Sequence, residues 1–236
     1  MKVFLDAGHG GKDPGACASG LVEKSMTLIT AKGAKAQLEA AGVTVMLSRT
    51  DDRFLTLTER AEKANRWGAD LLVSCHYNAG GGDRGEVIHS VSGGRGKALA
   101  EKVAMSIAEL GQGSTRIYCK PATSGSGDYF TVIAKSNMPA IIVEPCFIDS
   151  SDRELADTED KQWGMGIAVA KGILNYLGIK EARAVKELTE VNDIVYELAV
   201  RDIISDSDLW IKRLNESKND YWLARKAVSY IRRAGV

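Results

Sequence analysis

Short apolar runs alternate with longer helical patterns along residues 1–179, and this alternation constrains the fold of the 236-residue chain more than any other feature. The order strand, helix, strand, helix, strand is typical of α/β proteins. Glycines that follow helical patterns, such as Gly42 and Gly178, support the predicted helix ends. The predicted strands are residues 3–5, 43–48, 71–75, 86–90 and 141–144, and the predicted helices are residues 23–41, 58–67, 96–110 and 161–177. The segment between Leu110 and Ala140 is loop-like in composition, and long loops of this kind are more often functional than structural.

The character of the sequence changes at Lys180. Residues 180–186 are charged and contain no glycine, and the residues beyond them hold three short helical patterns but no strand pattern. We therefore expect two units, an α/β domain over residues 1–179 and a small all-helical C-terminal module over residues 180–236. At about 50 residues, such a module is near the lower size limit for independent folding.

Three of the predicted strands end at a side chain that can bind a metal or transfer a proton. The first strand leads to His9, the strand that begins at Leu71 leads to His76, and the strand that begins at Ile141 ends at Glu144. In open α/β sheets the working crevice lies outside the carboxyl ends of the strands. The chain is therefore expected to be an enzyme with these residues in one crevice.

The glycine-rich loop around His9 fits neither common phosphate-binding pattern. The Walker pattern requires Ser or Thr after Gly-Lys, but Asp13 follows Lys12. The dinucleotide fingerprint matches at Gly8 and Gly10 and fails at Asp13. A plain surface turn with a solvent-facing histidine remains an alternative for His9.

His9, Glu23 and His76 offer two imidazoles and one carboxylate, which is a known catalytic zinc set that leaves one position for water. Glu144 is the candidate general base that takes the proton of water and passes it to the leaving amine. The spacing is not that of a helix-borne zinc motif, so the fold must assemble this site. Glu23 could instead only complement the dipole of the helix that follows it. The third histidine, His89, is expected to pack or to form hydrogen bonds.

Composition excludes some classes of function. Lys plus Arg and Asp plus Glu both number 31, so bulk charge indicates no nucleic-acid partner. No apolar run approaches the roughly 20 residues needed to span a bilayer, and no signal peptide pattern is present. We therefore expect synthesis in the cytoplasm and, for an extracellular target, release by another protein. The four cysteines have no C-x-x-C pairing and are expected to be reduced, with Cys75 and Cys146 inside apolar strands.

Several segments together resemble the zinc-dependent N-acetylmuramoyl-L-alanine amidases of the amidase 3 family, in the family's order. The matching segments are Leu5–Ala16 (LDAGHGGKDPGA), Gly20–Lys24 (GLVEK), Ser48–Asp51 (SRTD), Leu57–Arg60 (LTER), Ala64 and Asn65, Ser74–Ala79 (SCHYNA), and Pro139–Glu144 (PAIIVE) with Phe147. The resemblance covers roughly residues 2–177. It implies a twisted, mostly parallel sheet flanked by helices, one Zn²⁺ per chain on His9, Glu23 and His76, and Glu144 as the catalytic glutamate.

The resemblance also implies peptidoglycan as the substrate and hydrolysis of the amide between N-acetylmuramic acid and L-alanine. A cell-wall hydrolase without a signal peptide and with a small C-terminal module is similar to a bacteriophage endolysin, released through a holin. The expected role of the module is to bind anionic cell-wall polymers or to form homo-oligomers. Asn78 and Glu86 flank the expected crevice and are candidate substrate contacts. The alternatives are a mother-cell or autolytic bacterial amidase, a non-catalytic wall-binding protein, and a zinc deacetylase or peptidase acting on another polymer.

Overall fold

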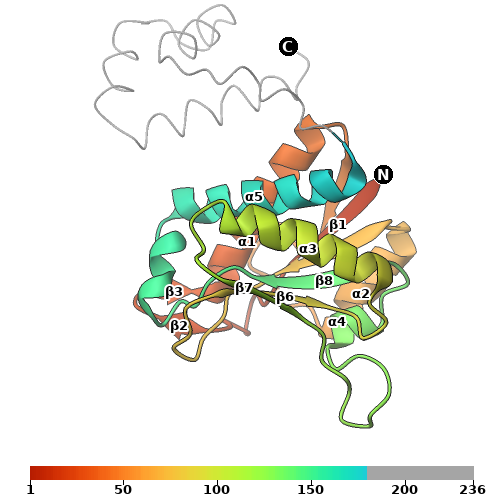
Figure 1. Cartoon of the computed structure of the whole chain (residues 1–236), viewed down its shortest axis with the longest axis horizontal. Helices are drawn as coiled ribbons and strands as arrows, with labels where there is room; N and C mark the ends of the chain where they lie inside the picture. The colour runs from red at the N-terminus through yellow and green to blue at the C-terminus, as the bar shows by residue number, and fades with distance from the viewer. Residues whose placement is uncertain (180–236) are drawn as a thin grey trace, which may run out of the picture. The chain divides into compact units, whose positions relative to one another are not determined.

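A computed structural model describes residues 1–179, and the expected C-terminal module lies outside the described residues. Six strands form one sheet in the order β4-β1-β5-β8-β6-β7 (Figure 1). The first four of these run parallel, β6 is antiparallel to β8, and β7 is parallel to β6. The α/β class and the mostly parallel sheet are therefore confirmed. The strands are β1 (Lys2–Ala7), β4 (Thr44–Leu47), β5 (Leu71–Cys75), β6 (Gly85–His89), β7 (Thr115–Tyr118) and β8 (Ala140–Glu144).

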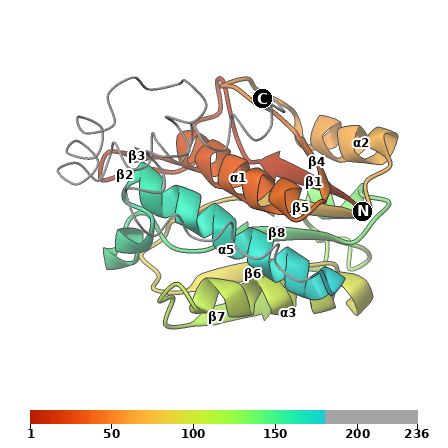
Figure 2. The ribbon, with the colours of Figure 1, turned by 90° about the horizontal axis from the view of Figure 1, so that it is seen from above.

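Helices cover both faces of the sheet. One face carries α1, α5 and α3 side by side, as Figure 2 shows, while α2 and the short α4 pack on the other face. The helices are α1 (Glu23–Ala40), α2 (Leu57–Trp67), α3 (Gly94–Ala108), α4 (Thr131–Ala134) and α5 (Glu159–Leu177), with a 3-10 turn η1 (Ser151–Leu155) before α5. The four long helices lie where the sequence predicts them, to within two residues at each end.

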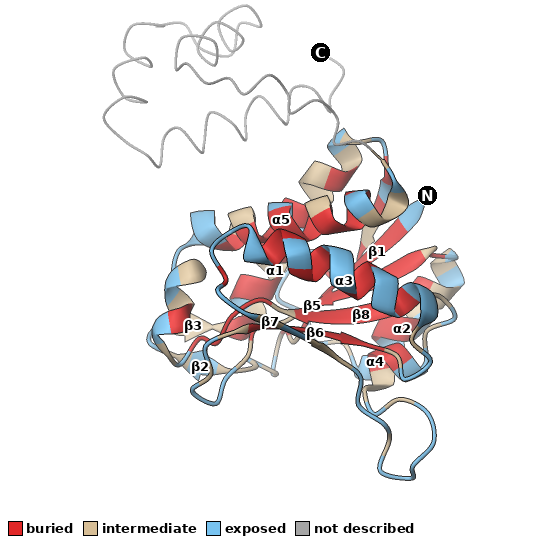
Figure 3. Ribbon diagram, in the orientation of Figure 1, coloured by how far each residue is buried: buried red, intermediate tan, exposed pale blue. Residues whose placement is uncertain are grey.

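The central strands are buried on both faces, which explains their continuous apolar runs. Along β1, Val3 and Leu5 face the layer of α1, α3 and α5, while Phe4 between them packs toward α2. Figure 3 shows this burial across the sheet. An alternating polar pattern would be expected only for a sheet with one solvated face.

The helices of the first layer pack closely because α5 presents glycines to its neighbours. A Cβ atom on Gly166 would lie 2.2 Å from the carbonyl oxygen of Thr30 in α1. A Cβ atom on Gly172 would lie 2.5 Å from Cα of Val103 in α3. Both separations are too short for real contacts, so a side chain at either position would push α5 away from the layer.

The segment 110–140 is not one loop, and this prediction is wrong in part. It contains β7 at the sheet edge and the four-residue helix α4. Both elements are too short for a periodic pattern, and β7 exposes Arg116, so no continuous apolar run marks it. The small hairpin of β2 (Cys17–Ala18) and β3 (Leu21–Val22) is also absent from the sequence predictions.

Cys146 lies outside a strand, which corrects the prediction for that residue. Strand β8 ends at Glu144, and the buried Cys146 packs in a small apolar cluster that includes Met26 of α1 and Tyr77. Cys75 lies in β5 as predicted and faces the core. All four cysteines are free thiols. Within residues 1–179, no helix is both long enough and apolar enough to cross a bilayer.

Candidate metal and catalytic site

The carboxyl ends of three neighbouring strands bring the predicted side chains to one edge of the sheet. His9 follows β1 by two residues, His76 comes directly after β5, and Glu144 is the last residue of β8. Glu23 is the first residue of α1, and its backbone N–H donates to the carbonyl oxygen of Ala16 at 2.9 Å. The β2–β3 hairpin between Ala16 and Glu23 thus returns the chain to the end of β1.

The carboxylate of Glu23 lies between the two imidazoles. Its Oε2 is 3.1 Å from Nε2 of His9, and its Oε1 is 3.0 Å from Nδ1 of His76. The ligand atoms of all three residues lie within 4.8 Å of one another. The structure therefore brings together the three predicted ligands, and their donor set of two nitrogens and one oxygen is suited to a zinc ion.

Asp13 completes the surroundings of His9, and the sequence analysis did not identify it. Its Oδ2 lies 2.9 Å from Nδ1 of His9. A carboxylate on one ring nitrogen favours the tautomer that keeps the other nitrogen free as a ligand. The position of Asp13 four residues after His9 in the same glycine-rich loop is the one feature that could have identified it.

Two glycines leave room for the ligand side chains. A Cβ atom on Gly8 would lie 2.4 Å from the ring of His76, and one on Gly15 would lie 2.5 Å from Oε2 of Glu23. Gly15 also has φ +67°, a conformation that other residues rarely adopt. Glycine in this loop therefore serves close packing around the three side chains rather than phosphate binding.

Two buried arginines fix the loop that carries His9. The guanidinium of Arg49 donates to the carbonyl oxygens of Ala7 and Gly8 at 3.0 and 2.8 Å. The guanidinium of Arg60 donates to the carbonyl oxygens of Ala7 and His9, both at 2.7 Å. These contacts hold His9 at φ +59°, which is uncommon for a residue other than glycine.

Arg60 also forms a fully buried ion pair beneath the loop. Its Nη1 lies 2.7 Å from Oδ1 of Asp6, and the hydroxyl of Ser74 donates to Oδ2 of Asp6 at 2.6 Å. Burial alone would raise the pKa of Asp6, but Arg60 and Ser74 outweigh it, so the pKa lies below its usual range. The aspartate is therefore ionised, and its charge is balanced by Arg60.

The charges of the site favour an ionised Glu23. Burial acts to raise the pKa of Glu23, but hydrogen bonds from His76 and His9 outweigh it and hold this pKa far below its usual range. For His9, burial acts to lower the pKa, and the carboxylates of Glu23 and Asp13 raise it overall. Two further backbone N–H groups, from Tyr77 at 2.9 Å and Ala16 at 2.8 Å, fix the carboxylate of Glu23.

The pKa of Glu144 is raised, in contrast to that of Glu23. Burial raises its pKa to about 7, with the carboxylates of Glu86 and Glu23 adding to the shift and the imidazoles of His76 and His9 opposing it. A carboxyl group with a pKa near 7 can accept and release a proton at neutral pH. This property suits a general base and does not suit a ligand that must stay ionised.

Glu86 lies beside Glu144, whereas Asn78 lies beyond the end of β5, where its N–H donates to the carbonyl oxygen of Cys146 at 3.0 Å. Glu86 of β6 is paired in register with Glu144 of β8, is 4% exposed, and contacts Arg84 and the hydroxyl of Tyr118. The side-chain oxygen of Asn78 accepts from the N–H of Ala79 at 2.8 Å. Substrate contact by either residue stays a prediction. His89 lies at the far end of β6 and bonds the carbonyl oxygen of Ser90.

Comparison with known proteins gives a family match over residues 3–175, to the Amidase_3 model described as N-acetylmuramoyl-L-alanine amidase. The sporulation-specific N-acetylmuramoyl-L-alanine amidase of Bacillus subtilis (strain 168) is 33% identical, over 77% of this chain and 70% of that protein. The endolysin of Bacillus phage SPP1 is 34% identical, over 76% of this chain and 67% of that protein.

Solved structures agree in fold. The amidase AmiC2 of Nostoc punctiforme matches with a TM-score of 0.65 and 36% identity, over 75% of this chain and 97% of that one. Cwp6 from Clostridium difficile matches with a TM-score of 0.71 and 34% identity. The match covers 75% of this chain but only 29% of Cwp6, so this chain corresponds to one part of that longer protein.

Because Arg60 is in a buried ion pair, we expect its replacement to destabilise the protein far more than replacement of Arg66, which also lies on α2. Replacement of Arg60 in Arg60→Met leaves Asp6 without its counter-ion, and we expect the free energy of unfolding at pH 7 to fall by about 3–5 kcal/mol. Arg66→Met removes an exposed pair with Glu62 and should change it by less than about 1 kcal/mol. Urea denaturation measures both variants. Equal losses would contradict a special role for the buried pair.

Proposed function

This chain belongs to the Amidase_3 family of N-acetylmuramoyl-L-alanine amidases, and we propose that it hydrolyses the amide between N-acetylmuramic acid and L-alanine of peptidoglycan with one zinc ion held by His9, Glu23 and His76. The observation that supports this proposal most strongly is the convergence of those three ligand atoms within 4.8 Å in a chain of this family. The donor set fits the ion, and the absence of side chains at Gly8 and Gly15 leaves room for the three proposed ligands.

The residues of the chain divide the reaction between them. A zinc ion bound here supplies Lewis acidity toward the amide carbonyl and water. Glu144 takes a proton from the attacking water and later donates it to the leaving nitrogen of alanine, because its pKa of about 7 allows both steps. Asp13 holds His9 in the tautomer that presents Nε2, and the N–H groups of Ala16 and Tyr77 orient Glu23.

The biological setting of the proposed activity is bacterial cell-wall lysis by a phage endolysin. The similarity to the endolysin of phage SPP1 supports this assignment. The comparable similarity to a sporulation-specific amidase supports the second candidate, a lytic amidase of a spore-forming bacterium. The genes beside this one, holin or sporulation genes, discriminate between the two. For residues 180–236 we retain the hypothesis of a wall-binding or oligomerising module released with the enzyme through a holin.

The metal assignment predicts that His76 is essential for zinc and that His89 is not. His76→Ala leaves two ligands, which do not retain the ion against a chelator, whereas the unsubstituted protein should hold one zinc per chain. His89→Ala is the matched control, because His89 contacts Ser90 at the other end of β6. Elemental analysis after dialysis gives the result. One zinc per chain in His76→Ala would refute the assignment.

The assignment of Glu144 as base rather than ligand separates binding from turnover. The Glu144→Gln variant should keep its zinc and its unfolding temperature. Its kcat should fall about 10²–10⁴-fold, because the carboxamide side chain that replaces the carboxylate cannot take a proton from water. Glu101→Gln, an exposed change on α3, is the control. The measurement is hydrolysis of purified cell walls alongside zinc content. Near-normal turnover by Glu144→Gln would assign the proton transfer to another residue.

The carboxylate of Glu86 predicts a shift in the pH dependence. Because Glu86 helps to raise the pKa of Glu144, Glu86→Gln should lower that pKa. Without the carboxylate of Glu86, the positive charge of Arg84 is no longer paired, and this charge also lowers the pKa of Glu144. Since the base must be ionised, the acidic limb of kcat/KM should move to lower pH than in the unsubstituted enzyme. A limb that stays in place or moves to higher pH would contradict this electrostatic role.

A further inference from the structure

The antiparallel strand β6 extends the polar row of the site away from the metal ligands. Glu144 of β8 is paired in register with Glu86 of β6, and Glu86 is paired with Arg116 of β7. Paired residues on neighbouring strands have side chains on the same face. Arg116 therefore lies on the face that carries Glu144, two strands and about 10 Å away at 4.7–4.9 Å per strand.

Glu86 does not neutralise Arg116. Its Oε1 accepts from Arg84 at 2.7 Å, and its Oε2 accepts from the hydroxyl of Tyr118 at 3.1 Å. Arg116 is exposed and forms no ion pair within residues 1–179. Its guanidinium carbon lies over the ring of Tyr118, 4.5 Å from the ring centroid. A guanidinium has five N–H donors, so it can contact an aromatic ring and still bind a carboxylate.

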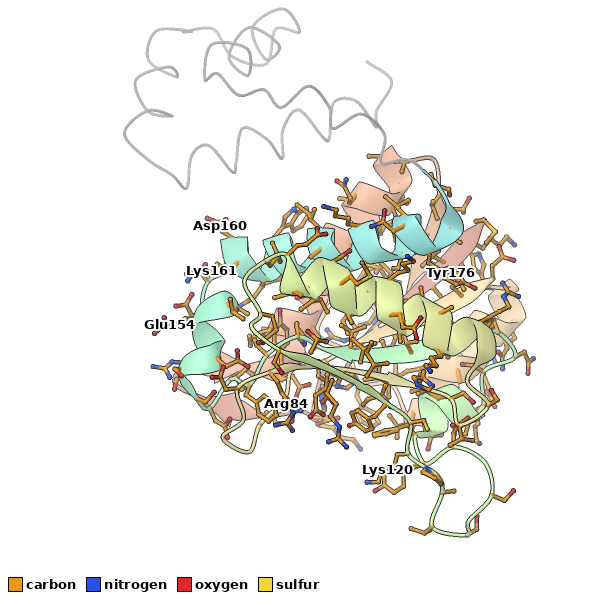
Figure 4. All side chains as sticks on the ribbon, viewed as in Figure 1. Arg84, Lys120, Glu154, Asp160, Lys161 and Tyr176 are labelled. Atoms are coloured by element: carbon orange, nitrogen blue, oxygen red, sulfur yellow. The ribbon has the colours of Figure 1, made fainter. Side chains whose placement is uncertain are left out.

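Lys120 repeats this arrangement four residues further along. Its Nζ lies 3.8 Å from the ring centroid of Tyr129 and 6.0 Å from that of Phe130. Lys120 is also exposed and without an ion pair in the described part of the chain. The nearby carboxylate of Asp128 is occupied by Ser90 and by the N–H of Val91. Figure 4 shows Lys120 and Arg84 on the same side of the sheet, opposite α3 and α5.

These two cations, Arg116 and Lys120, form what we call the cation strip. Each is fixed on an aromatic ring, which limits its freedom before a ligand binds. Each keeps an uncompensated positive charge on the face that carries the proposed base. A strip of this kind fits an extended chain with anionic groups at intervals. The glycan side of the scissile amide has no such series of charges, whereas a peptide can carry carboxylates on successive residues.

We propose that the cation strip binds carboxylate groups of the peptide that follows L-alanine, with Arg116 nearest the scissile amide, an inference that rests on the proposed amidase function. At about 3.3–3.6 Å per extended residue, the separation of roughly 10 Å between Glu144 and Arg116 corresponds to about three residues. The strip thereby directs the peptide along β7 and makes the enzyme selective for stems whose carboxylates are free rather than amidated.

The test uses the zinc-loaded full chain and two soluble N-acetylmuramoyl tripeptides that differ at one position, a free carboxylate or a carboxamide on the third residue counted from the alanine. Arg116→Gln should lower kcat/KM about tenfold or more for the carboxylate peptide, as expected for a lost charged hydrogen bond, and by less than about twofold for the carboxamide. Arg116→Lys should fall between Arg116→Gln and the unsubstituted enzyme. Lys102→Gln, an exposed change on α3, is the charge control.

Lys120 is tested with longer peptides. Lys120→Gln should lower kcat/KM for a heptapeptide with a free terminal carboxylate but leave the tripeptide unchanged, because only the longer chain spans the further roughly 13 Å from Arg116 to Lys120. Zinc content and unfolding temperature, measured on each variant, should match the unsubstituted enzyme, since both side chains are exposed.

Three results would overturn the inference. An equal loss on the carboxylate and carboxamide peptides would show that Arg116 acts on the structure of the site rather than on the ligand charge. A loss on intact walls with none on either soluble peptide would assign the strip to an anionic wall polymer. If the unsubstituted enzyme cleaved neither peptide, the amidase proposal itself would fail, and the inference with it.

Discussion

The rest of the site depends on one constraint, which is that the carbonyl oxygens of residues 7–9 must find hydrogen-bond donors. Two buried guanidinium groups supply these donors. The carbonyl oxygens of residues 7–9 lie where the chain leaves β1, and the guanidinium groups of Arg49 and Arg60 donate to all three. Unpaired buried carbonyls would cost about 1–3 kcal/mol each. Asp6 balances the charge of Arg60 beneath this loop, in which His9 has a positive φ.

The position of Glu23 follows from the same loop. The backbone N–H groups of Ala16 and Tyr77 donate to its carboxylate from two different segments, so the backbone orients this proposed ligand. The two imidazoles approach this carboxylate from the ends of β1 and β5, which are neighbours in the sheet. A preorganised ligand set loses little freedom on binding and therefore favours tight retention of a metal.

Because β6 runs antiparallel to β8, Glu86 and Arg116 can have different proposed roles on the face that carries Glu144. Parallel strands would place only carboxyl ends at this edge, whereas β6 and β7 enter the sheet there at their amino ends. Glu86 consequently stands beside Glu144, and Arg116 stands one strand further on, rather than at the far edge. One carboxylate tunes the proposed base, and the cation beyond it faces the solvent where the rest of the substrate would extend.

The sequence by itself determined the α/β class, the limits of the long helices, and the delivery of His9, His76 and Glu144 by strand ends, because apolar periodicity and strand exits are local properties. The resemblance to the family implied the ligand roles and the substrate. Only the tertiary structure decided that Asp13 contacts His9, that β7 and α4 lie within the segment 110–140, and that Glu86 stands beside Glu144. Those features depend on strand order and register, which are set by contacts between residues far apart in the chain and leave no periodic pattern in the sequence.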